Sequence, residues 1–470
     1  MIKPWALTIC ALLPLCPPPA QAAKKMNVVF LDICSARADH FGTYGYKRNT
    51  TPNIDSLGKR AAVFENAVSE GSWCLPGYAS LLTGHVPEVH GLYTNLPAKK
   101  LPPFESTLAQ ELGGAGYRTA LFSGGVYLIP EWGLTRGFDE YNNTFSSATA
   151  DRTPAPFENN LAATLSWMKK NKEQPFFLFA TIDNLHVPYQ SADPDIYDRG
   201  YEGVVHSSDV LTVPFARVHN GEFEGRENMR ADVEEFKSDP RHLKHMTAHY
   251  DAALKGVDRL IGNFVKKLRE MGLEENTVLI ISADHGEMLG EKGLLNNTQS
   301  LYEPVSHVPL IVRNPAIPES SGKRFKQLVQ RIDLMPTILD MAGVSKYGLG
   351  LQGHSFVPLL KDPASPWREY AFARNRRSIP YREGDSMIEE RIARDKCWKL
   401  HHYIYKPKWE LYNLCSDPNE TKDLAKARPD VVARLAFQLV KNMEETRPHQ
   451  PGPPTGMARP VIEASDEPRN

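Results

Sequence analysis

The segment G-S-W-C-L-P-G-Y-A-S-L-L-T-G, residues 71–84, sets a cysteine, Cys74, two residues before Pro76 and ahead of a short apolar run. Proline is favoured in the first turn of a helix because the N–H there needs no partner. Cys74 is therefore predicted at the positive end of a new helix, where an anion is stabilised and a thiol pKa can fall. The alternative interpretation is a small buried residue on a capped helix.

Acidic residues follow two strand-like runs. Residues 27–31 form a continuous apolar run that ends at Asp32, and residues 277–283, T-V-L-I-I-S-A, lead into Asp284 and His285. Continuous apolar runs are typical of buried parallel strands, and ligand sites in such sheets gather at the carboxyl ends of the strands. Two carboxylates and an imidazole form an ordinary ligand set for a divalent cation. The alternative for an isolated Asp at a strand end is a turn or a helix cap.

Strand-like and helix-like segments alternate along the chain, as an α/β fold requires. We expect a large mixed, mostly parallel sheet flanked by helices, followed by a smaller C-terminal α+β lobe. The predicted strands are residues 27–31, 118–122, 175–182, 277–283 and 308–312. The predicted helices are residues 106–114, 161–170, 250–268, 334–342 and 430–443.

The N-terminus resembles an export signal. Residues 1–22 contain a basic Lys3, a short apolar stretch and the small-residue site Ala20-Gln21-Ala22, which predicts a cleaved signal peptide. We expect a secreted or periplasmic protein without a membrane span. The main α/β domain is predicted at residues 23–349 and a small antiparallel-sheet lobe at 350–445. The Pro-rich tail at 446–470 is predicted to be disordered.

Charge and cysteine content narrow the function classes. The formal net charge is −1, so no overall field indicates a nucleic acid or an anionic membrane as partner. Cys397 and Cys415 flank two alternating runs that read as a hairpin, which makes them a disulfide candidate in an oxidising compartment. A bridge between Cys34 and Cys74 is a second possibility, and it would make Cys74 a structural residue.

Four sequence blocks together carry a family resemblance. They are L-D-I-C-S-A-R-A-D-H-F-G-T-Y-G-Y with T-T-P-N-I-D, then C-L-P-G-Y-A-S-L-L-T-G, D-N-L-H-V-P-Y, and S-A-D-H-G-E-M-L-G-E-K-G followed by L-Y-E-P-V-S-H-V-P-L-I-V. In order and spacing the chain resembles the sulfatase family of the alkaline-phosphatase superfamily, from about Asn27 to about Leu439. The resemblance implies an alkaline-phosphatase-like fold and the hydrolysis of sulfuric esters.

The resemblance also implies roles for particular residues. Cys74 matches the catalytic cysteine, which a formylglycine-generating enzyme oxidises to formylglycine, and His186 matches a position that could protonate the leaving alcohol. Arg37 is a candidate for holding the anion. Asp32, Asp284 and His285 match positions that bind one divalent cation. Calcium is the favoured ion, with manganese, magnesium and zinc as alternatives.

Some positions depart from the family pattern. Tyr78 stands where the maturation motif C-x-P-x-R has Arg, and Asn297 occupies a position that is often basic. By position, both remain candidate substrate-binding residues. The usual Lys-x-His is absent, because the chain runs F-S-G-G-V-Y-L there. These losses remove cationic contacts to the anion, each of which is worth a few kcal/mol in a desolvated site.

Three hypotheses follow for the function. The first is an exported, metal-dependent sulfuric-ester hydrolase that acts on a sulfated small molecule or glycan. The second is a phosphoric-ester or phosphonate hydrolase on the same scaffold, with a phosphorylated substrate. The third is a catalytically inactive, carbohydrate-binding relative in which Cys74 is disulfide-bonded.

Overall fold

The computed structural model describes residues 25–93, 100–144, 156–202, 239–297, 300–379, 386–405 and 408–446. The expected signal peptide at residues 1–22 and all of the expected tail at 446–470 except Thr446 lie outside the described residues. In the described part of the chain, no helix combines the length and the apolar character that a membrane span needs.

The core is a mixed sheet in which nine strands are described. Across the sheet they are β4 (Glu140–Asn143), β3 (Arg118–Ser123), β5 (Phe176–Ile182), β1 (Asn27–Ile33), β6 (Thr277–Ser282), β8 (Leu310–Arg313), β2 (Ala62–Val68) and β7 (His307–Val308), with β9 (Arg324–Gln330) paired to β2. From β4 to β6 all pairs are parallel, and β8 then runs antiparallel to β6. The predicted fold class is confirmed.

The central strands bring the two acidic segments together. Every residue of β1, β5 and β6 is buried, because helices cover both faces of a parallel sheet and favour continuous apolar strands. Asp32 of β1 pairs in register with Ser282 of β6. The segment after Ser282 therefore leaves the sheet beside Asp32, so that Asp284 and Asp32 lie at the same edge.

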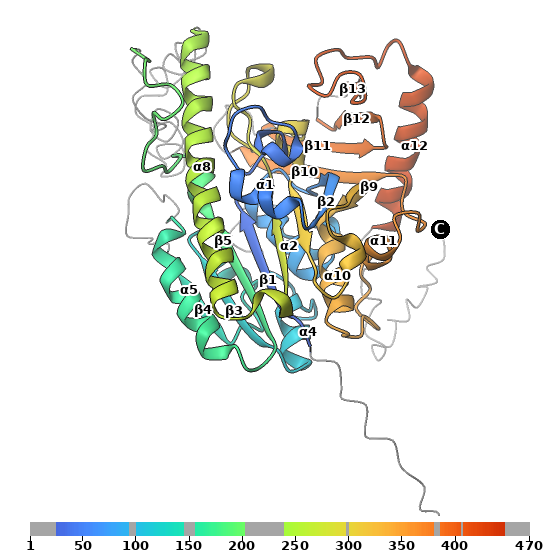
Figure 1. The fold of residues 1–470 in the computed structure, drawn as a ribbon. Helices are drawn as coiled ribbons and strands as arrows, with labels where there is room; N and C mark the ends of the chain where they lie inside the picture. Colours follow the sequence, from blue (N-terminus) through green and yellow to red (C-terminus); the bar gives the residue numbers. More distant parts are fainter. Residues whose placement is uncertain are drawn as a thin grey trace, which may run out of the picture.

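Two groups of helices flank the sheet, with the strands between them (Figure 1). One group contains α1 (Pro52–Gly58), α5 (Glu158–Asn171) and α8 (Pro240–Glu270). The other contains α2 (Cys74–Thr83), α4 (Leu108–Gly114) and α10 (Leu334–Met341). Helix α8 begins well before the predicted start at Tyr250, because Asp239 caps it by accepting from Arg241 N and Pro240 occupies its first turn.

The C-terminal lobe is a four-stranded antiparallel sheet with one long helix beside it (Figure 1). Its elements are β10 (Ala371–Ile379), β11 (Ser386–Arg394), β12 (Trp398–Tyr403), β13 (Lys408–Asn413) and α12 (Pro429–Glu445). A disulfide joins Cys397 and Cys415 at the two ends of the β12–β13 hairpin. The smaller C-terminal sheet expected from the sequence is present, and its boundary at residue 350 stays a prediction.

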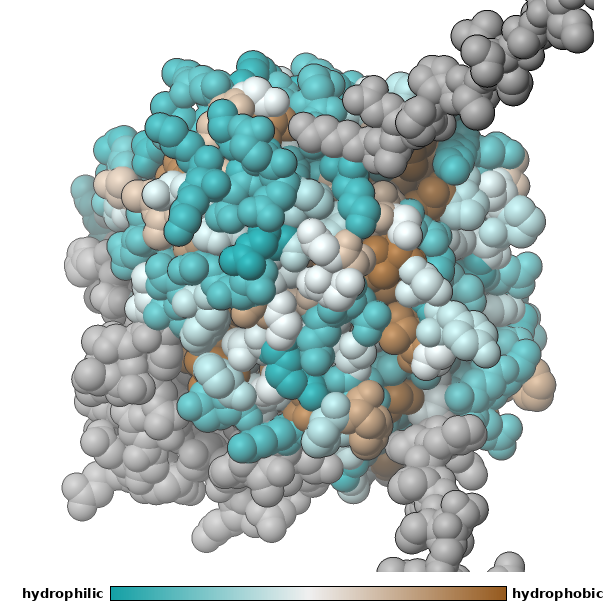
Figure 2. Space-filling view, turned by 90° about the horizontal axis from the view of Figure 1, so that it is seen from below, coloured by the Kyte–Doolittle hydropathy of each residue, from teal (hydrophilic) through white to brown (hydrophobic). Residues whose placement is uncertain are grey.

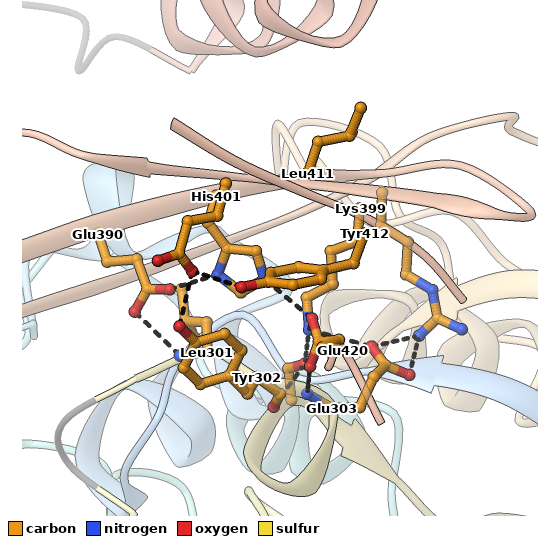
Figure 3. Close-up of polar contacts among 12 residues, drawn as sticks. Leu301, Tyr302, Glu303, Glu390, Lys399, His401, Leu411, Tyr412 and Glu420 are labelled. Atoms are coloured by element: carbon orange, nitrogen blue, oxygen red, sulfur yellow. Dashed lines mark hydrogen bonds and ion pairs between the residues drawn. The ribbon is translucent and has the colours of Figure 1, made fainter. Parts of the chain in front are cut away.

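A buried charged cluster fastens this lobe to the main domain (Figure 3). Lys399 Nζ of β12 donates to Glu303 Oε1 of α9 (Glu303–Ser306) at 3.0 Å and lies 3.2 Å from Glu420 Oε1. His401 lies between Glu390 Oε1 at 2.6 Å and Glu420 Oε1 at 2.9 Å. We name these five residues the lobe cluster.

The surface shown in Figure 2 is mostly hydrophilic, with hydrophobic residues exposed in small separate areas. Scattered apolar residues of this kind are normal on a protein surface that faces water.

Candidate active site

Helix α2 carries Cys74 into the core. Cys74 is its first residue, and all of its residues are buried. The helix lies tightly against the segment after β6, since a Cβ at Gly77 would meet the carbonyl oxygen of Asp284 at 3.0 Å. Glycine permits this approach. Cys74 thus lies at the positive end of α2, beside the strand end that carries Asp284.

Cys74 has two close partners with reactive side chains. Its Sγ lies 3.3 Å from His285 Nε2 and 3.6 Å from Cys34 Sγ. Both cysteines are free, so the Cys34–Cys74 bridge is not formed in this structure. The hydrogen bond with Cys74 and burial raise the pKa of Cys34 well above its usual range, which keeps Cys34 a thiol.

His285 is positioned from both ring nitrogens. Nδ1 donates to the carbonyl oxygen of Gly286 at 2.8 Å, and Nε2 faces Cys74. Burial acts to lower the pKa of His285, but Asp284 and Cys74 outweigh burial and raise that pKa to about 10. At neutral pH the ring is therefore an imidazolium, which favours negative charge on an atom at residue 74.

The two carboxylate oxygens of Asp284 differ in their hydrogen bonding. Oδ1 accepts from the backbone N–H of Ser35 at 3.1 Å and of His285 at 2.9 Å. Oδ2 lies 3.4 Å from His285 Nε2 and has no hydrogen-bond partner among the described residues. An open, buried carboxylate oxygen is a natural point of attachment for a cation or a proton.

Asp32 is paired with an arginine that sequence reasoning missed. Arg331 Nη2 donates to Asp32 Oδ2 at 2.7 Å and Nη1 donates to Oδ1 at 3.2 Å. The pKa of Asp32 is raised to about 6, because burial raises it more than Arg331 lowers it. The two residues are 299 positions apart, so no local pattern could have indicated the pair.

The donor atoms fit a divalent cation in part. Donors of Cys34, Cys74, Asp284 and His285 lie within 4.8 Å of one another, and Asp32 does not belong to this set. Asp284 Oδ2 and His285 Nε2 suit a cation, which would displace the imidazole proton. Both oxygens of Asp32 accept from Arg331, so the guanidinium competes with a cation for this carboxylate. Its role as a ligand stays a prediction.

His186 and Arg37 lie near this cluster in different states. His186 Nδ1 donates to Val187 O at 2.9 Å, and burial lowers the pKa of the ring, so His186 is neutral. A neutral ring needs the negative charge of a bound substrate to raise its pKa before it can act as an acid. Arg37 is held by Asp39 at 2.8 Å and Glu291 at 2.6 Å, so its guanidinium is already neutralised.

Tyr78 and Asn297 are both buried near acidic groups. Tyr78 is 1% exposed, and its hydroxyl has no hydrogen-bond partner among the described residues. Burial raises its pKa well above the usual range, and the charge of Asp284 adds to the rise. Asn297 Nδ2 lies 3.5 Å from Glu287 Oε2. Burial raises the pKa of Glu287 to about 8, so this carboxyl holds a proton at neutral pH.

Two further carboxyls missed by sequence reasoning are buried around the site. Burial raises the pKa of both Glu70 and Asp183 to about 7. Asp183 follows β5 directly, and Asp32 at the end of β1 and Asp284 just after β6 lie at the same edge, so the strand-end rule could have indicated it. Glu70 has no such signal.

The mixed sheet, with a cysteine at a helix start and acidic residues at its strand ends, has the alkaline-phosphatase-like fold. A family model described as Sulfatase matches residues 26–344, and one described as N-sulphoglucosamine sulphohydrolase, C-terminal, matches residues 290–449. The chain belongs to the sulfatase family, whose members are sulfuric-ester hydrolases.

Individual relatives agree with this assignment. The chain is 25% identical to the ulvan-active sulfatase of Formosa agariphila, covering 92% of this chain and 89% of the relative. It is 26% identical to an arylsulfatase of Clostridium perfringens, covering 90% and 95%. Both alignments extend through the C-terminal lobe as well as the main domain.

Solved structures share the fold. One protein, solved with its substrate D-glucosamine-2-N,6-O-disulfate, has a TM-score of 0.74 at 19% identity, covering 91% of this chain and 99% of that one. A phosphonate monoester hydrolase of Silicibacter pomeroyi has a TM-score of 0.70 at 22% identity, covering 90% and 96%. The same fold therefore serves both sulfur and phosphorus esters.

Proposed function

We propose that this chain is an exported hydrolase of sulfuric esters that acts through residue 74 on sulfated saccharides or smaller sulfated molecules. The observation that carries the proposal is Cys74 at the start of α2, 3.3 Å from His285 Nε2 and beside the buried Asp284. The helix N-terminus and the positive charge at His285, from its proton or from a cation that replaces it, favour the negative charge that a sulfate ester brings and that grows as its bond breaks.

Maturation is the first step of the proposal. Sulfatases generally carry formylglycine, and we propose that a formylglycine-generating enzyme oxidises Cys74 in the same way. Without a cation, Nε2 of His285 carries a proton toward residue 74, and a bound cation would take the place of that proton. His186 would protonate the leaving alcohol once the substrate anion has raised its pKa.

A divalent cation completes the proposed site, held by Asp284 and His285. When bound, it supplies Lewis-acid stabilisation of the ester oxygens. Calcium prefers oxygen ligands, so it remains the proposed ion when residue 74 carries oxygen in place of sulfur. Thiol and imidazole donors suit zinc, which we expect to bind unmodified protein instead.

The saccharide part of the proposal is supported by the names of relatives. The relative from Formosa agariphila is named as an ulvan-active sulfatase. One protein with the same fold was solved with a disulfated glucosamine as its substrate. Hydrolysis of phosphonate monoesters is the second candidate, supported by the fold neighbour named for that activity. A phosphonate monoester and a sulfate ester carry similar charge, so the cluster around Cys74 suits both.

The test is mass analysis of the Cys74 peptide from exported protein, followed by assays on sulfated saccharides, aryl sulfates, aryl phosphates and phosphonate monoesters. We expect aldehyde at residue 74 and release of sulfate from a sulfated saccharide. Faster turnover of phosphonate monoesters would favour the second candidate. A Cys34–Cys74 disulfide with no turnover of any ester would contradict both and leave the carbohydrate-binding hypothesis.

A further inference from the structure

A second group of metal-ligating side chains lies on α8 and shares no residue with the cluster around Cys74. His245 and His249 are four positions apart on this helix, and Asp195 approaches them from the turn at residues 193–201. Residues at this spacing lie on one helix face. One donor atom from each of the three residues lies within 4.8 Å of the other two.

The ring nitrogens converge on one carboxylate oxygen. His249 Nε2 lies 3.1 Å from Asp195 Oδ1, and His245 Nε2 lies 4.0 Å from the same oxygen. Ligands about 2.0–2.1 Å from a tetrahedral zinc ion lie about 3.3 Å from each other. The observed separations bracket this value, so shifts of less than about 1 Å would complete the site.

Neighbouring groups fix the orientation of His245. Its Nδ1 donates to Asp198 Oδ2 at 3.0 Å, which leaves the lone pair on Nε2, the atom that faces Asp195. A carboxylate behind an imidazole is the usual support of a metal-binding histidine. Tyr201 stacks on the same ring, with ring centroids 3.7 Å apart and an interplanar angle of 11°, and so holds its plane.

The two histidines of the proposed site are buried, whereas its aspartate is open to solvent. The side chains of His245 and His249 are each 3% exposed, whereas that of Asp195 is 54% exposed. An ion can therefore enter from the side of Asp195.

A purely structural role accounts for less of this geometry. A structural role, holding the turn against α8, needs only two hydrogen bonds. These are the bond of His249 with Asp195 and the bond of His245 with Asp198. Those two bonds do not require His245 Nε2 to face Asp195 Oδ1, the oxygen that His249 contacts. They also do not require the two imidazole rings to lie with their centroids 4.3 Å apart. A shared cation explains why these donors face one point.

We propose that Asp195, His245 and His249 bind a divalent transition-metal ion, with zinc as the favoured ion and a fourth coordination position left open. Two imidazoles and a carboxylate are a donor set that zinc prefers and that calcium and magnesium do not. The ion would clamp the turn at residues 193–201 to α8.

The experiment is calorimetric titration of zinc into metal-stripped, full-length protein that carries Cys74→Ala, which weakens the other candidate cluster. We expect one class of binding. His245→Gln and His249→Gln should each weaken it about 100-fold or more, and Asp198→Asn should weaken it by about 10- to 100-fold. Cobalt titrated into the same proteins should give tetrahedral visible absorption that follows the same order.

His242→Gln is the matched control, because His242 lies on the same helix outside the ligand set and should leave zinc binding within about twofold. The exposed Asp195→Ser serves if a buried histidine variant fails to fold, and it should also lose binding. Unchanged binding in Asp195→Ser and His249→Gln, or no binding in the parent, would overturn the proposal. Because zinc is the probe, this result does not depend on ester hydrolysis.

Discussion

The lobe cluster and the cluster around Cys74 are both buried and charged, but they differ in how completely their polar atoms are paired. In the lobe cluster both ring nitrogens of His401 face carboxylates. Glu390 Oε2 accepts from Leu301 N at 2.9 Å and Glu420 Oε2 accepts from Glu303 N at 2.6 Å. Figure 3 shows these contacts as one continuous network.

Around Cys74, several buried atoms have no hydrogen-bond partner among the described residues. They include Asp284 Oδ2, Glu287 Oε1, Glu70 Oε2 and the hydroxyl of Tyr78. Leaving a buried polar atom unpaired costs about 1–3 kcal/mol. Such a cost persists where a ligand, an ion or a reacting group completes the pairing. The unpaired atoms therefore indicate that the cluster around Cys74 binds and reacts, whereas the fully paired lobe cluster joins two parts of the fold.

The largest expected effect breaks the reactive cluster. Cys74→Ala should lower the turnover of a sulfated substrate by about 1,000-fold or more, because the nucleophile is removed. The free energy of unfolding should change by only about 1 kcal/mol. Turnover and chemical denaturation are measured on the same preparation. Undiminished turnover would place the reaction elsewhere.

The lobe cluster should respond in the opposite way. Lys399→Met leaves Glu303 and Glu420 buried without their shared ammonium, which should lower the free energy of unfolding by about 3–5 kcal/mol. Turnover per folded molecule should be retained. Lys408→Met is the matched control. The Lys408 side chain is 61% exposed, so its ion pair with Glu410 contributes about 1 kcal/mol or less to stability. Equal losses in the two variants would contradict a dominant role for the buried network.

The pH dependence of stability tests the same network. Burial acts to lower the pKa of His401, but Glu390 and Glu420 raise it above its ordinary value. A raised folded pKa stabilises the protein fully below the unfolded value of about 6.5, and this contribution is lost as pH rises through the folded pKa. Wild type should therefore exceed His401→Gln by about 2 kcal/mol near pH 6, with a smaller gap in alkaline solution. Denaturant titrations at several pH values measure the gap, and a gap that widens with pH would be inconsistent with this sign.

The sequence predicted four of the parallel strands, β1, β3, β5 and β6, because they are continuous apolar runs, and it did not predict the polar edge strand β4. It did not predict β2, where Glu65 and Asn66 interrupt the apolar run at a register shift against β9. It also missed the first turns of α8, whose polar and histidine-rich residues do not follow the apolar period. Local patterns report local burial, and the failures at β2 and α8 occur where tertiary contacts decide.

The same limit applies to the site. Cys74, Asp284 and His285 could be predicted, because a helix start and a strand end are local signals. The pairing of Asp32 with Arg331 could not, because it joins distant segments. That pairing changes the expected chemistry most, since it gives Asp32 a permanent cation of its own.

The smallest expected effect compares one chemical change at Tyr302, whose ring packs against His401 of the lobe cluster, with the same change at Tyr78 near Cys74. Tyr302 donates to Glu410 Oε2 at 2.7 Å, so Tyr302→Phe should lower the free energy of unfolding by about 1–2 kcal/mol. Tyr78→Phe removes a buried hydroxyl that has no partner among the described residues, so stability should be unchanged or rise by about 1 kcal/mol. We expect Tyr78 to contact the substrate because of its position in the sequence motif, so kcat/KM should nevertheless fall by about tenfold, the effect of one lost hydrogen bond. Denaturation and steady-state kinetics on both variants measure the two effects. Equal stability losses would show that the hydroxyl of Tyr78 is paired in solution, and the contrast between the two clusters would then fail at this residue.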